Sequence, residues 1–144
     1  MWEDFMVRIE ENALSAVTFR DLFLSVGWET PSLAQIEIAL SNSLRTFIVI
    51  EEDKSIGMAR LLGDYAMSYY IKDFAIRPEF QGRGIGRYLM EHIDASIRKE
   101  LKEGWSVSLE LISSKGQESF YKKFEFEERP CEWDGAGMFK MIRK

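Results

Sequence analysis

Hydrophobic and polar positions in the first part of the chain predict one strand, two amphipathic helices and then a pair of strands. We expect Gly27 to close the first helix, Thr30 to cap the second helix, and Asp53 to lie in the polar turn between the paired strands. The four segments that carry this pattern are, in order, FMVRI, SAVTFRDLFLSV, TPSLAQIEIAL and TFIVIEEDKSIGMARLLGD.

The middle of the chain predicts a buried strand followed by a long helix. SYYIKDFAI is nearly continuous in apolar residues, which is typical of a central strand. Apolar residues then recur every fourth position and form one face of an amphipathic helix. These residues are Leu89, Ile93, Ile97 and Leu101.

The C-terminal part predicts a strand, a short helix and two last strands. WSVSLELI alternates, and Ser114 with Gln117 forms a capping-box pattern before the helix GQESFYKKF. The tail FEFEERP…GMFKMIRK reads as two strands. A hairpin meander implies an antiparallel part, and the strand–helix–strand unit implies a right-handed parallel crossover. The sequence therefore predicts a mixed α/β fold in one domain, residues 1–144.

Composition narrows the classes of function. The chain has 144 residues and a net charge of −5, which disfavours nucleic-acid binding but not a cationic substrate. Cys131 is the only cysteine, so an internal disulfide is excluded. The N-terminus is acidic, unlike a signal peptide, and no apolar run approaches the length of a membrane span. The sequence has no cluster of histidine and cysteine residues that would indicate a metal site. We expect a cytoplasmic protein without membrane contact.

The stretch QGRGIG, residues 81–86, stands between the central strand and the long helix. Glycines permit a tight turn, which is the simpler interpretation, but they also let an anion approach the unpaired amides of a helix N-terminus. Arg83 and Arg87 add positive charge at the same end. The triphosphate motif GxxxxGK[ST] is absent, and the dinucleotide motif GxGxxG fails because Leu89 or Arg87 stands where its last glycine is required.

This stretch resembles the Q/R-x-x-G-x-G/A signature of the GNAT acyltransferase superfamily. SFYKKFEFEER, residues 119–129, is similar to that family's FYxKxGF segment, and the predicted order of elements matches over nearly the whole chain. The resemblance implies a central mixed sheet that is mostly antiparallel, with one splayed parallel pair and helices on both faces. It also implies acetyl-coenzyme A as cosubstrate.

The resemblance assigns the coenzyme to backbone groups. It implies that the amides of residues 83–86 bind the pyrophosphate and that the backbone of Phe74 and Ile76 bonds the pantetheine arm. Ser113 and Ser114 stand where the family often has an asparagine, and helix capping by Ser114 is an alternative. The cofactor-binding candidates are Phe74, Ile76, Gln81, Gly82, Arg83, Gly84, Ile85, Gly86, Arg87 and Ser114.

The resemblance also implies catalytic residues. Tyr121 matches the family's tyrosine beside the sulfur, where a phenol donates a proton or a hydrogen bond to the departing thiolate; a core tyrosine is the alternative. The general base stays open between Glu110, Asp73 and water, and strand alternation places Asp73 on the face opposite Lys72. His92 is expected to be structural, and Trp28 either stacks on an acceptor or packs in the core.

These observations predict an N-acetyltransferase that moves an acetyl group from acetyl-coenzyme A to a primary amine by direct attack. The acceptor is a small molecule, such as a polyamine, or a peptide N-terminus. A non-catalytic acyl-coenzyme A binding module is the alternative, and a nucleotide-binding domain is disfavoured by the missing motifs. A homodimer is common in the family, and the sequence does not decide it.

Overall fold

The computed structural model describes residues 6–144, so Phe5 of the predicted first strand lies outside the described residues. Contacts divide the chain into two units, residues 1–111 and 112–144. The first unit holds a five-stranded sheet in the order β1-β2-β3-β4-β5. All neighbours are antiparallel except β4 and β5, which confirms the predicted fold class. The strands are β1 (Val7–Glu11), β2 (Arg45–Glu51), β3 (Lys54–Gly63), β4 (Ser68–Ile76) and β5 (Ser108–Glu110).

Serine residues begin both of the first two helices. The Ser15 side chain caps α1 (Ala16–Ser25) by accepting a hydrogen bond from the backbone amide of Thr18. The Ser32 side chain caps α2 (Leu33–Ser41) in the same way, with the amide of Gln35 as donor. The prediction of Thr30 as a cap is wrong, because the Thr30 hydroxyl instead donates to the carbonyl of the next residue. The backbone of Ser32 is extended, with φ −63° and ψ 156°, which suits an N-cap residue.

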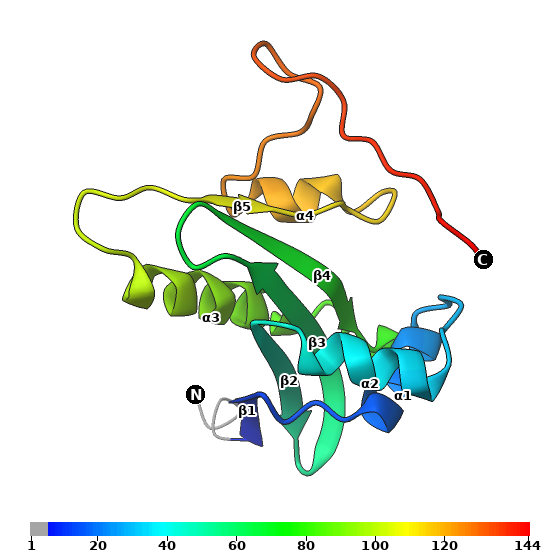
Figure 1. The fold of residues 1–144 in the computed structure, drawn as a ribbon. Helices are drawn as coiled ribbons and strands as arrows, with labels where there is room; N and C mark the ends of the chain where they lie inside the picture. Colours follow the sequence, from blue (N-terminus) through cyan, green and yellow to red (C-terminus); the bar gives the residue numbers. More distant parts are fainter. Residues whose placement is uncertain (1–5) are drawn as a thin grey trace. The chain divides into compact units, whose positions relative to one another are not determined.

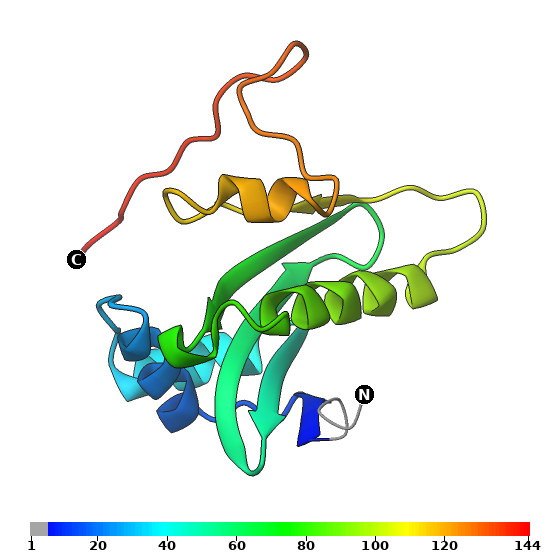
Figure 2. The same ribbon diagram turned by 180° about the vertical axis from the view of Figure 1, so that it is seen from behind.

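The helices cover opposite faces of the sheet, as Figures 1 and 2 show from the two sides. α1 and α2 lie on one face, and α3 (Ile85–Glu100) lies on the other. Phe47 of β2 points to the α3 face, where its ring lies 5.6 Å from that of His92. The Nε2 atom of His92 lies 2.8 Å from a carboxylate oxygen of Glu11 on β1, so His92 links α3 to the sheet. A structural role for His92 was predicted.

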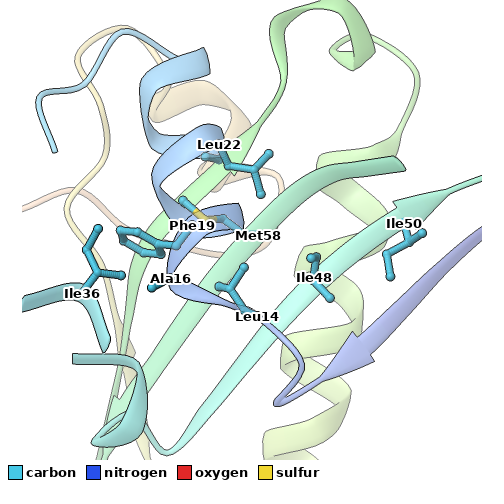
Figure 3. Packing of buried hydrophobic residues seen from close by; sticks show 9 residues of the cluster. Leu14, Ala16, Phe19, Leu22, Ile36, Ile48, Ile50 and Met58 are labelled. Carbon is cyan, nitrogen blue, oxygen red and sulfur yellow. The ribbon is translucent and has the colours of Figure 1, made fainter. Parts of the chain in front are cut away.

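The hydrophobic core under α1 and α2 is drawn in Figure 3. Side chains of the helices meet alternate residues of the strands, because successive strand residues point to opposite faces. Trp28 packs against this cluster, with its ring 5.0 Å from that of Phe23, which favours the core role for Trp28. The buried members are Leu14, Ala16, Phe19, Leu22, Ile36, Ile48, Ile50, Met58 and Ala75.

The second unit contains one short helix, α4 (Glu118–Lys122). The predicted capping box is wrong, because Gln117 precedes the helix without a side-chain cap and Ser114 contributes only its carbonyl. The two predicted tail strands are also wrong, since residues 123–144 form no strand. Alternation alone does not make a strand; its backbone groups must find a partner strand. Within the described part of the chain, no helix has the length and apolarity needed to cross a membrane.

Candidate functional site

The glycine-rich loop joins the end of β4 to the start of α3. A single 3₁₀ turn, η2 (Pro78–Phe80), begins the connection. The side-chain amide of Gln81 then donates to the carbonyl of Ile76 at 2.9 Å. Gln81 therefore ties the loop back to the last residue of β4. The side chain of this cofactor-binding candidate has a structural partner in the strand.

Gly82 and Gly84 adopt backbone angles that favour glycine. Their φ angles are +78° and +82°, in the left-handed region that L side chains rarely adopt. A Cβ atom added at either position would meet nothing within 4 Å. Close packing of the protein against itself is therefore not the reason for these two glycines. Their backbone conformation sets the direction of the loop. The space beside the two glycines is open to a ligand.

The N-terminus of α3 differs from those of α1 and α2. Gly84 is its N-cap, so no side chain caps the helix, and its first turn contains no acidic residue. Unsatisfied amides and the helix dipole concentrate positive potential at such an end. Serine hydroxyls satisfy the equivalent positions of α1 and α2. The start of α3 thus has the donors and the field that an anion needs.

Arg83 in the loop and Arg87 in the first turn of α3 each have a carboxylate partner. Arg83 donates twice to Glu51 of β2, over 2.6 and 3.2 Å, and its guanidinium lies 5.3 Å from the centre of the Phe80 ring. Arg87 lies 3.4 Å from Glu91, one turn later in α3. These carboxylates offset part of the arginine charge, and the backbone amides add their own preference for an anion.

β5 pairs with only the first part of β4. Their parallel pairing begins at Ser68 and ends where Tyr70 pairs with Glu110, whereas β4 continues to Ile76. Burial raises the pKa of the Tyr70 phenol above its ordinary value, and the nearby charge of Glu110 raises it further. Glu110 thus lies at the end of the β4–β5 pairing.

A bulge interrupts β4 at Asp73. The register passes from Arg60 opposite Lys72 to Met58 opposite Ala75, so two residues of β4 stand opposite Ala59 alone. Asp73 has a φ of +56°. Its carboxylate accepts a hydrogen bond from Arg60 Nε at 2.7 Å, and Arg60 stands opposite Lys72. The prediction that alternation separates Asp73 from Lys72 is therefore wrong, because the extra residue breaks the alternation.

Tyr121 belongs to the second unit, on α4. Its ring lies 5.1 Å from the Phe120 ring and 6.0 Å from the Phe126 ring, in edge-to-face geometry. Burial raises the pKa of Tyr121 to about 12, so the phenol keeps its proton at neutral pH. In the same unit, the hydroxyl of Ser113 donates to the carbonyl of Ser114.

Comparison with known families decides the membership of this chain. Residues 42–128 match the model described as "Acetyltransferase (GNAT) domain". The chain belongs to the GNAT acetyltransferase family. This confirms the resemblance seen in the sequence, and the match includes both the glycine-rich loop and the segment around Tyr121.

GNAT relatives are similar to this chain over most of its length, in sequence and in fold. The uncharacterized N-acetyltransferase ycf52 of Gracilaria tenuistipitata var. liui is 36% identical over 80% of this chain. This chain spans 61–65% of the length of the ycf52 relatives. A probable acetyltransferase of unknown function from meticillin-resistant Staphylococcus aureus has a TM-score of 0.83 and 30% identity, covering 95% of this chain and all of that one. A GNAT family protein from Streptococcus pneumoniae TIGR4 has a TM-score of 0.77 and 27% identity, covering 96% and 100%.

Sequence reasoning missed two residues whose contacts hold parts of the candidate site. Arg60 contacts Asp73, and Glu51 holds Arg83. One signal was present for the first pair: an arginine and an aspartate interrupt neighbouring apolar strands, and opposite charges on adjacent strands often pair. No local signal indicated the second pair, whose members are 32 positions apart.

Proposed function

We propose that this GNAT protein is an N-acetyltransferase that moves the acetyl group of acetyl-coenzyme A to a primary amine. The observation that carries the proposal is the uncapped N-terminus of α3 behind two glycines with open space before them. That arrangement suits the pyrophosphate of the coenzyme, because the backbone amides of residues 83–86 supply donors and the glycines supply access. The backbone of Phe74 and Ile76, on β4 beyond its pairing with β5, would bond the pantetheine arm.

The reaction needs two proton movements. The amine nitrogen attacks the thioester carbonyl carbon; the new C–N bond forms, the C–S bond breaks, and the thiolate departs. The amine loses a proton to a base, and the released thiolate takes its proton from solvent. Family resemblance implies that Tyr121 lies beside the sulfur. A phenol with a pKa of about 12 donates a hydrogen bond there, because full transfer to a thiolate of ordinary pKa, ~8.5, is uphill by roughly 5 kcal/mol.

Glu110 is the better candidate for the general base. It lies where the pairing of β4 and β5 ends, and the family resemblance implies that the thioester enters between these two strands. Asp73 already accepts a hydrogen bond from Arg60, and its side chain is only 13% exposed. An acid–base role suits a carboxylate at the end of the β4–β5 pairing better than one that holds the bulge of β4.

We expect Glu110→Gln to lower kcat/KM near neutral pH by about 10²-fold, the lower end of what a positioned base contributes. The remaining rate should rise with pH toward the ordinary pKa of the amine, ~10, because only free amine then reacts. Asp73→Asn should keep the wild-type pH dependence. The measurement is the pH–rate profile of the three proteins. Identical profiles would leave water as the base.

The test of the function is release of free coenzyme A when the protein is incubated with acetyl-coenzyme A and a panel of amines. The panel contains polyamines, aminoglycoside-like amines and peptides with free N-termini. Acetylation of one class, seen by mass spectrometry, supports the transferase. Tight binding of acetyl-coenzyme A with no acetylation across the panel favours the second function, a binding module.

A further inference from the structure

The bulge of β4 is held by a chain of contacts that reaches across three elements. Arg60 of β3 donates from Nε to Asp73 at 2.7 Å and from Nη1 to the Ser43 hydroxyl at 3.3 Å. Ser43, just after α2, in turn donates to the carbonyl of Ala39 at 2.8 Å. The side chains of Arg60 and Asp73 are 14% and 13% exposed, so little water competes for them. One guanidinium therefore joins the bulge to the end of α2.

The backbone of Asp73 explains why such a contact is needed. A φ of +56° is unfavourable for most residues, although aspartate tolerates it better than they do. A strained residue persists only where its surroundings hold it. The bulge also sets the direction of the backbone that follows, including Phe74 and Ile76.

We propose that Arg60 is a positioning residue for the acyl donor. Through Asp73, Arg60 holds the β4 bulge. It thereby orients the backbone hydrogen-bonding groups of residues 74–76 toward the pantetheine arm. The role for the donor rests on the proposed function, whereas the role in the bulge does not. This assigns Asp73 to the architecture of the site and not to proton transfer.

The first measurement is hydrogen exchange in the ligand-free protein. Arg60→Met removes both hydrogen bonds while keeping a side chain of similar length. We expect amide exchange within residues 72–76 to rise at least tenfold, while exchange in β2 stays as in wild type. Asp73→Gly should give the same pattern, because glycine adopts the positive φ but offers no carboxylate. It serves as the second variant should Arg60→Met not fold.

The second measurement is the affinity for acetyl-coenzyme A by calorimetry, at a temperature where each variant is folded. We expect Kd to rise at least tenfold in Arg60→Met. Arg45→Met is the matched control, because Arg45 is 13% exposed and is likewise paired with a carboxylate, that of Glu100. Arg45 lies on β2, which β3 separates from the bulge of β4. The melting temperature of Arg45→Met should fall, with Kd within threefold of wild type. A merely structural Arg60 predicts equal Kd changes in the two variants.

The outcomes separate the two proposals. Wild-type protein that binds no acetyl-coenzyme A contradicts the proposed function, and the exchange data then decide the bulge alone. Faster exchange with unchanged Kd in Arg60→Met overturns the positioning role. Unchanged exchange in both Arg60→Met and Asp73→Gly overturns the role of Arg60 in the bulge as well.

Discussion

Tyr121→Phe should lower turnover by about 10²–10³-fold, which is typical for loss of one donor to developing negative charge. The phenylalanine ring preserves the edge contacts with Phe120 and Phe126, so the fold of the second unit should be kept. Affinity for acetyl-coenzyme A should be nearly unchanged, because the loop and strand backbones are untouched. The measurement is kcat at saturating acetyl-coenzyme A, beside a melting curve.

The alternative for Tyr121 is a core residue with no part in the reaction. That alternative predicts a lower melting temperature with wild-type turnover in the folded fraction. The pKa of this phenol also sets the pH range in which a catalytic Tyr121 would keep its proton. Because burial raises the pKa of Tyr121 to about 12, the wild-type enzyme should not lose activity through this phenol below about pH 11. Wild-type kcat in the phenylalanine variant would reject the catalytic role and favour the binding module.

Gly84→Val should weaken binding of acetyl-coenzyme A by about 10²–10⁴-fold. The added side chain would fill the open space before the amides at the start of α3. Loss of two hydrogen bonds to a charged group, each worth about 1.5–3 kcal/mol, corresponds to that range. Gly86→Val should weaken binding too; Gly86 is the second residue of α3, so its backbone is helical and the substitution is less strained. Calorimetry gives both affinities.

The chain offers a matched control for the strain at Gly84. Gly104 has the same φ, +82°, and likewise has nothing within 4 Å of an added Cβ. Gly104→Val should therefore impose a comparable backbone cost without touching the loop. We expect both variants to melt at similarly lowered temperatures, with only Gly84→Val losing the coenzyme. Equal affinities in the two folded variants would remove the pyrophosphate from this loop.

Local features of this protein followed from the sequence alone. The hairpin turn at Glu52 and Asp53 was predicted from its polar residues, and both adopt positive φ. Leu89, Ile93 and Ile97 are buried on one face of α3, as their spacing predicted. The glycine motif and its position between a strand and a helix also identified the family. These features depend on residues close together in the chain, so periodicity and short motifs reveal them.

Tertiary structure decided the features that join distant residues. β5 is shorter than predicted, and the tail strands did not form, because a strand depends on its neighbours as much as on its own alternation. The bulge moved Asp73 beside Arg60, which stands opposite Lys72, whereas alternation predicted Asp73 on the face opposite Lys72. Glu51 at the end of β2 pairs with Arg83 of the glycine-rich loop. Such contacts arise from the register between strands and the packing of helices on them, and no local pattern in one sequence contains that information.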